Sequence, residues 1–98
     1  MRLRFLPAAA LEFVKEISYY TKNGRPGAAP RFVAAVEAAG KMALRHPLGG
    51  APSFGETRAY KVKDFPFLLV YRVARTEVLV VALAPTSREE AYWRARVE

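Results

Sequence analysis

The spacing of apolar residues divides this chain into a helix-forming first half and a strand-forming second half. Apolar residues recur three and four positions apart over residues 8–23, and again from about residue 29 to residue 45, which predicts two amphipathic helices. Four other segments alternate in polarity or are rich in Val, Tyr, Phe and Leu, and they are predicted to be strands: residues 2–5, 57–63, 67–73 and 77–83. The order strand, helix, helix, three strands predicts an α+β fold.

Each predicted helix has one apolar stripe. The stripe of the first helix consists of Ala10, Phe13, Val14, Ile17 and Tyr20, and Glu12 belongs to the polar side. The stripe of the second helix consists of Phe32, Ala35, Val36, Ala39, Met42 and Ala43. The connection between the helices is short and contains Gly and Pro, so we expect an antiparallel helical hairpin. The hairpin is predicted to pack on one face of an antiparallel sheet, in a single domain over residues 1–98.

The predicted sheet is apolar on both faces. Residues 78–83 contain no polar side chain, and residues 67–70 are also entirely apolar. Two helices cover only one face of such a sheet, so the second face needs another cover. Either the C-terminal segment of the chain or a partner protein provides that cover, and the sequence leaves both options open.

Composition excludes several kinds of chemistry. The chain has 98 residues and no cysteine, so disulfide and thiolate chemistry are absent, as is usual in a reducing cytoplasm. The single histidine, His46, has no second histidine or acidic cluster at metal-ligand spacing, so we expect no metal and no cofactor. No apolar run is long enough to span a bilayer, so we expect no membrane partner.

The balance of charge favours an anionic partner. Sixteen Lys and Arg residues against nine Asp and Glu residues give a formal net charge of +7, and the pI is near 10.1. Such a charge attracts nucleic acid, the ribosome or an acidic protein segment over long range. A solvated basic surface without any such partner is the alternative, and charge alone does not choose among them.

One run of sequence carries a family resemblance. Residues 58–72, RAYKVKDFPFLLVYR, resemble the hallmark of the RelE/ParE superfamily of bacterial toxins, in which an Arg-led basic strand leads into Phe-Pro-Phe and an apolar strand ending in Tyr. The resemblance extends over the chain in the right order, through Ala10-Leu11-Glu12, Tyr19-Tyr20, Phe32, Val80-Val81-Ala82-Leu83-Ala84, Arg88 and Ala91-Tyr92-Trp93. It is closer to the ParE branch than to the RelE branch.

The resemblance implies a cytoplasmic toxin that a cognate antitoxin protein holds inactive. The acidic, amphipathic C-terminal segment of the antitoxin would wrap the toxin, cover apolar surface and balance its positive charge. The residues expected to contact the antitoxin are Arg58, Lys61, Lys63, Leu68, Val70 and Arg72. This partner would supply both the missing cover of the sheet and the counterpart of the +7 charge.

The superfamily contains ribosome-dependent mRNA endoribonucleases and ParE-like inhibitors of DNA gyrase. Metal-independent RNA cleavage needs a base, an acid and cations near the scissile phosphate. Lys61 and Tyr92 stand where the nucleases have such groups, and Arg88 is a further cation. Leu68 stands where an Arg would hold the phosphate, and loss of such a group costs on the order of a hundredfold in rate. We therefore expect gyrase inhibition without catalysis, with mRNA cleavage through Lys61, Arg88 and Tyr92 as the alternative.

For a gyrase inhibitor the functional surface is a binding surface. Tyr92, Trp93, Arg94 and Arg96 are the expected target-binding residues, because aromatic and Arg side chains are the usual anchors of protein interfaces. The alternative is intramolecular, with Trp93 packed on the open face of the sheet and the arginines outside. A third possibility is a decayed family member that retains the fold and antitoxin binding but is not toxic.

Overall fold

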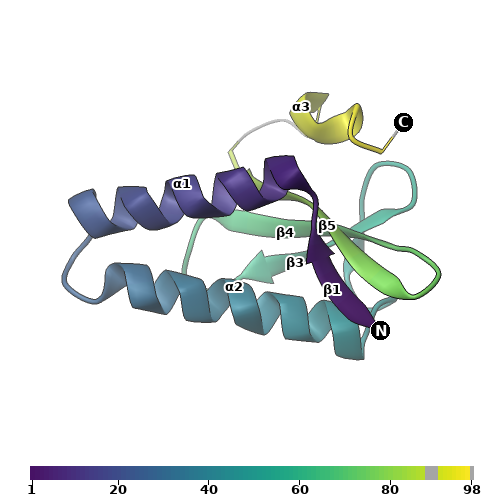
Figure 1. The fold of residues 1–98 in the computed structure, drawn as a ribbon, viewed down its shortest axis with the longest axis horizontal. Coiled ribbons are helices and arrows are strands. Elements are labelled where there is room, and N and C mark those ends of the chain that lie inside the picture. Colours follow the sequence, from purple (N-terminus) through teal and green to yellow (C-terminus); the bar gives the residue numbers. More distant parts are fainter. Residues whose placement is uncertain (88–90, 98) are drawn as a thin grey trace.

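The computed structural model describes residues 1–87 and 91–97 and has the predicted α+β architecture (Figure 1). The predicted elements are β1 (Arg2–Phe5), α1 (Pro7–Asn23), α2 (Ala28–Arg45), β3 (Thr57–Val62), β4 (Phe67–Val73) and β5 (Glu77–Pro85). Their bounds differ from the predicted ones by two residues at most. Two further elements, β2 (Ala51–Pro52) and α3 (Ala91–Arg94), are too short to have a detectable period.

The sheet is mixed, so the prediction of a purely antiparallel sheet was wrong in one strand. The strand order is β1-β5-β4-β3-β2, and β1 runs parallel to β5 while the other pairs are antiparallel. The chain leaves β1 through the helical hairpin and returns as a three-stranded meander, whose last strand comes to lie beside β1 in the same direction. Because β5 has a neighbour on each side and cover on both faces, its sequence is continuously apolar.

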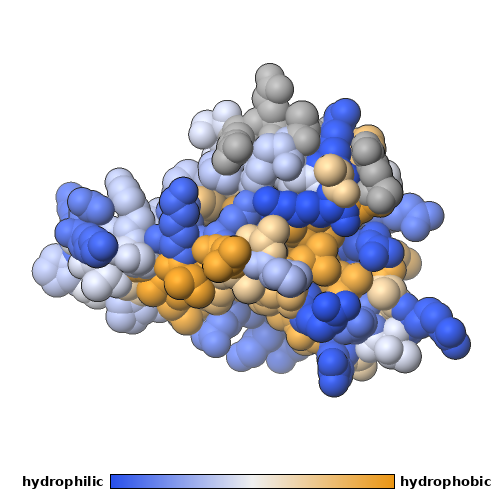
Figure 2. Space-filling model, turned by 45° about the horizontal axis from the view of Figure 1, so that its top comes forward, coloured by the Kyte–Doolittle hydropathy of each residue, from blue (hydrophilic) through white to orange (hydrophobic). Residues whose placement is uncertain are grey.

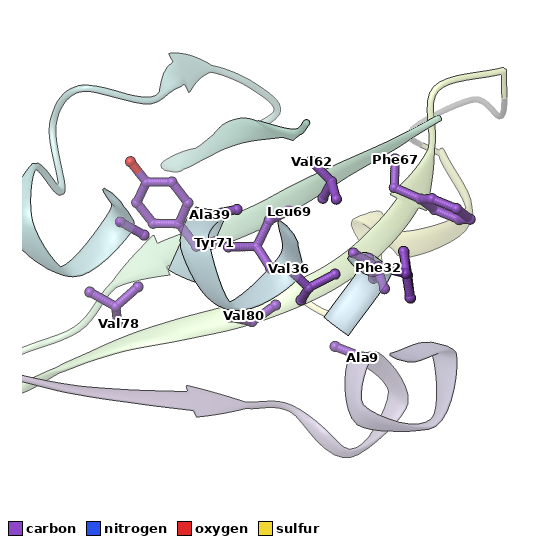
Figure 3. Packing of buried hydrophobic residues seen from close by; sticks show 12 residues of the cluster. Ala9, Phe32, Val36, Ala39, Val62, Phe67, Leu69, Tyr71, Val78 and Val80 are labelled. Carbon is purple, nitrogen blue, oxygen red and sulfur yellow. The ribbon is translucent and has the colours of Figure 1, made fainter. Parts of the chain in front are cut away.

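The helical hairpin covers one face of the sheet and encloses the main core (Figure 3). Phe32 and Val36 of α2 contact a cluster that includes Leu69 and Val80 of the sheet. The hairpin and this face of the sheet therefore form one apolar layer, as predicted.

Two residues of the predicted helical stripes are exposed instead of buried. Val14 is 63% exposed and Met42 is 42% exposed, whereas Ala9, outside the predicted stripe, is fully buried. The buried side of α1 is centred on the line from Ala9 through Phe13, and Val14 lies roughly 100° around the helix from that line, given 3.6 residues per turn. The periodicity predicted the helix correctly but misplaced its contact line.

The second face of the sheet is covered by the chain itself. Trp93 is 2% exposed and packs in a second apolar cluster with Val70 and Val81 of the sheet. Phe54 and Val97 pack against the same cluster. In Figure 1, α3 lies beyond the start of α1, on the side away from α2. Of the two covers that the sequence left open, the C-terminal segment is the one present in this structure.

Candidate protein-binding surfaces

The C-terminal segment is attached to the body of the molecule by a paired ion contact. The Arg96 guanidinium donates two hydrogen bonds of 3.0 Å to the two carboxylate oxygens of Glu12. Both side chains are largely shielded, with exposures of 21% for Arg96 and 23% for Glu12. Two-point Arg–carboxylate contacts fix geometry as well as charge. Glu12, predicted to lie on the polar side of its helix, instead faces the C-terminal segment.

The same two side chains complete the edge of β5. Strand β1 stops pairing at Phe5, opposite Val80, and Val81 has no partner in the register of β4. The Val81 carbonyl accepts a 3.0 Å bond from Arg96, and the Leu83 N–H donates a 3.1 Å bond to Glu12. Buried backbone groups need such partners. Glu12 and Arg96 therefore supply the hydrogen-bond partners that a longer β1 would have given this part of β5.

The predicted target-binding residues are mostly engaged inside the molecule. Trp93 is buried, and the Arg94 guanidinium lies 4.4 Å from the centre of the Phe54 ring. The Arg96 guanidinium lies 5.3 Å from the centre of the half-buried Tyr92 ring. In this conformation the four residues form the attachment of the C-terminal segment more than an open surface.

The predicted antitoxin-binding residues lie in three different settings. Val70 is 1% exposed, and Leu68 is half-buried beside it in the second cluster. Arg72 is half-buried, and within the described residues its Nε atom is buried without a hydrogen-bond partner. Lys61 and Lys63 are exposed. Arg58 is half-buried and lines a surface hollow that contains no residue of the C-terminal segment, so the two lysines are the exposed members of this set.

The residues of the nuclease alternative are only partly placed. The Lys61 Nζ atom donates to the backbone carbonyls of Val62 and Phe65. Arg88 lies outside the described residues. Leu68 packs in an apolar cluster, where it has no group to offer a phosphate. Lys61 in this arrangement closes the β3–β4 turn.

The loop that follows α2 is fixed to the sheet by side-chain hydrogen bonds. Residues 46–50 follow α2, and their carbonyls accept hydrogen bonds from three side chains of β3 and β4. Tyr60 donates to His46 O at 2.7 Å, Tyr71 to Pro47 O at 2.7 Å and Arg58 to Gly50 O at 2.9 Å. The Gly50 N–H returns a 3.2 Å bond to the Tyr71 hydroxyl.

The two glycines of this loop allow the close approach. A Cβ atom on Gly50 would lie 2.5 Å from the Tyr71 hydroxyl, and one on Gly49 would collide with the Tyr60 hydroxyl. The rings of Tyr60 and Tyr71 stack with centroids 5.7 Å apart. Thus Arg58, Tyr60 and Tyr71 of the hallmark run hold a loop in place. A Gly-Gly pair facing strand tyrosines was the signal that could have predicted it.

Burial also changes the acidity of one of these tyrosines. The ring of Tyr71 lies at one end of the main core with its hydroxyl directed away from the apolar side chains (Figure 3). Burial raises the pKa of the Tyr71 hydroxyl, and the bond from Gly50 and the charge of Arg58 offset part of that increase. The hydroxyl therefore remains protonated, and able to donate to the loop, to a higher pH than an ordinary tyrosine.

The outward face of α1 is more apolar than an ordinary solvated helix face. Leu11 is 71% exposed and Val14 is 63% exposed, and the exposed Lys15 and Lys22 lie on the same side of the helix. Figure 2 shows one face of the molecule, on which apolar groups gather across the middle and hydrophilic groups surround them. Apolar patches bordered by charge are typical of protein-binding surfaces.

These features define a small basic α+β protein with exposed apolar and basic side chains on its surface. In the described residues no helix is long and apolar enough to cross a membrane, and no three His, Asp or Glu side chains are grouped to hold a metal ion. Residues 3–90 match the family described as the ParE toxin of the type II toxin-antitoxin system, parDE. The chain belongs to this family, within the RelE/ParE superfamily, and is a ParE-like toxin of a type II system.

Individual relatives agree with this assignment. The chain is 34% identical over 74 residues to "Putative toxin Y4kP" of Sinorhizobium fredii (strain NBRC 101917 / NGR234), a match that covers 74% of this chain and 77% of that protein. The fold is similar to that of a chain of the chromosomal ParDE TA system from P. aeruginosa, with a TM-score of 0.74 and 20% sequence identity. That match covers 87% of this chain and 95% of the other, so the resemblance of fold extends over nearly the whole structure.

Proposed function

We propose that this toxin stops growth by inhibiting DNA gyrase and that a cognate antitoxin neutralises it. Membership of the ParE family is the observation that carries the proposal, since the ParE-like branch acts on gyrase and is paired with antitoxins. The protein acts as a binding partner of its target and does not catalyse a reaction.

Two features support gyrase over mRNA as the target. Leu68 packs in an apolar cluster at the position where a nuclease would hold the scissile phosphate. The Lys61 amine is engaged with two backbone carbonyls. An RNA-cleaving site needs cations preorganised around the developing phosphorane charge, and these positions offer little of that kind.

The antitoxin surface in this proposal is the outward face of α1. An acidic amphipathic helix would lay apolar side chains on Leu11 and Val14 and carboxylates beside Lys15 and Lys22. The +7 charge of the toxin speeds the encounter with such an acidic partner. Lys61 and Lys63 offer a second group of exposed cations for the same extended segment.

Purified gyrase tests the choice of target. The expected result is inhibition of supercoiling with accumulation of gyrase–DNA cleavage complexes, while mRNA in a translating extract stays intact. Cut mRNA with normal supercoiling would instead establish the nuclease alternative. Expression without the antitoxin is expected to arrest growth, and normal growth at full expression would establish the decayed, non-toxic alternative.

The antitoxin surface is tested separately by co-purification of the toxin with its cognate antitoxin. Leu11→Asp together with Val14→Asp is expected to abolish co-purification, because both side chains are exposed and their loss leaves the core intact. Glu37→Lys, an exposed change on α2, is the matched control and is expected to retain binding. Equal recovery of the double variant and the wild type would exclude α1 as the antitoxin surface.

A further inference from the structure

The fixed loop after α2 presents the most exposed large apolar side chain among the described residues. Leu48 is 74% exposed, more than Leu11 at 71% or Met1 at 65%. A single exposed leucine on a mobile loop is ordinary. This one is different because the backbone on both sides of it is held to the sheet. Before it, the carbonyls of His46 and Pro47 accept bonds from Tyr60 and Tyr71, and after it the Gly50 carbonyl accepts a bond from Arg58.

A hollow lies beside Leu48. It has a volume of about 320 Å³ and is lined by Leu48, Pro52, Glu56, Thr57, Arg58, Tyr71 and Val73. Leu48 and Val73 are its exposed large apolar lining residues, and Val73 is 38% exposed. Arg58 and Glu56 are its charged lining residues, and Arg58 is held in position by its 2.9 Å bond to the Gly50 carbonyl. A site of this size accommodates one apolar side chain from a partner.

The rigidity of this region has a consequence for binding. Interface anchors act best when their conformation is already set, because little entropy is then lost on association. Here the loop backbone is fixed by four side-chain hydrogen bonds, and its Gly-Gly sequence leaves no room for other residues. The arrangement holds Leu48 out of the core at a constant place beside the hollow.

We infer that Leu48 and the adjoining hollow form the surface that contacts the target of the toxin. The inference rests on the proposed function, and it places the contact away from the tail residues Trp93 and Arg96, which are engaged within the molecule. The partner is a folded protein that inserts an apolar side chain between Leu48 and Val73. It also places a carboxylate beside the Arg58 guanidinium.

Two arguments favour the target over the antitoxin as this partner. A small, preformed site suits docking of one folded protein on another with little change of shape. A wrapping antitoxin segment needs an extended surface, and the outward face of α1 offers Leu11 and Val14 beside two exposed lysines. Two partners with different shapes therefore have two separate surfaces available.

The test compares two exposed apolar residues. Leu48→Asp is expected to lose growth arrest, with the concentration needed to inhibit supercoiling rising about thirtyfold or more, as for the loss of an interface anchor. Met42→Asp is the matched control, since it introduces the same charge at an exposed apolar residue of α2 and is expected to remain toxic. Fluorescence of the buried Trp93 and thermal melting verify that both variants fold.

Three results would overturn the inference. Leu48→Asp could arrest growth like the wild type, or it could lose binding to the antitoxin while remaining toxic. The third is a wild-type homodimer that Leu48→Asp converts to a monomer in analytical ultracentrifugation, which would make a second copy the occupant. If the wild type arrests growth without affecting gyrase, the proposed target is wrong, but the comparison of Leu48→Asp with Met42→Asp still reports on the contact site.

Discussion

Glu12 and Arg96 are 84 positions apart in the sequence, and their side chains meet through two hydrogen bonds of 3.0 Å. The pair also accepts the N–H of Leu83 and donates to the carbonyl of Val81, so it completes the edge of β5 past the end of β1. One contact thus attaches the C-terminal segment and satisfies buried backbone. The stability of the sheet and the position of the segment are therefore coupled.

This coupling predicts the effect of removing either partner. Glu12→Ala leaves the Leu83 N–H without its acceptor, and we expect a loss of about 1–3 kcal/mol in the free energy of unfolding. Arg96→Ala is expected to fall in the same range, and the double variant to cost clearly less than the sum. Urea denaturation measures all three. Strict additivity would contradict the paired role, and Arg4→Ala, which removes the more exposed contact with Glu77, is a control expected to change stability less.

Trp93 is the only tryptophan of the chain and reports on the covered face of the sheet. We expect its fluorescence to be blue-shifted in the native protein and to move to the red on unfolding. Trp93→Ala should lower the free energy of unfolding by about 3–5 kcal/mol through the cavity it leaves, and Trp93→Phe by less. Solvent-like emission from the native protein would contradict the packing against Val70 and Val81.

The close contact of Gly49 with Tyr60 predicts that a substitution at Tyr60 offsets part of the destabilisation caused by a substitution at Gly49. Gly49→Ala is expected to destabilise the protein by about 1–3 kcal/mol, since its Cβ would collide with the Tyr60 hydroxyl. Tyr60→Phe removes that hydroxyl together with its bond to His46. The combined variant is expected to be more stable than the sum of the single effects predicts. Thermal melting of the four proteins measures this coupling, and independent effects would argue against a fixed loop.

The buried Tyr71 hydroxyl predicts a dependence of stability on alkaline pH. Because its folded pKa is raised above the ordinary value of about 10, its contribution is fully present below that value. The contribution is lost as the pH rises through the folded pKa. Burial also raises the pKa of Tyr20, so phenolate absorbance during an alkaline titration is expected to show two late-titrating tyrosines, one of which Tyr71→Phe removes. An unchanged titration curve in that variant would contradict the assignment.

In the turn between β3 and β4, the backbone conformation of Asp64 predicts that two substitutions affect stability differently. Its φ of 68° lies in the left-handed region, which Asp tolerates and glycine prefers. Asp64→Gly is expected to leave stability unchanged or slightly raised, whereas Asp64→Val should cost about 1–3 kcal/mol through backbone strain. Chemical denaturation distinguishes them. A larger loss for glycine than for valine would mean that the Asp64 side chain holds the turn.

The local sequence pattern predicted most of the helices and strands. It predicted little of which side of each element contacts its neighbours. The period of α1 was evident, yet Val14 was placed in the core and Glu12 on the polar side. Both residues lie beside the line along which α1 contacts the core. At such positions the helical period does not decide whether a side chain is buried, because burial depends on which other segment packs there. The parallel pairing of β1 with β5 also had no local signal, because it depends on where the meander ends.

The sequence by itself determined the helices, the strands and the family, since helical and strand periods and the run from Arg58 to Arg72 are properties of neighbouring residues. The tertiary structure decided which surfaces remain open. It buries Trp93 against the sheet, joins Arg96 to Glu12 and fixes the loop that exposes Leu48. These outcomes depend on groups distant in sequence meeting in space, where each buried polar group needs a partner and each apolar face needs a cover.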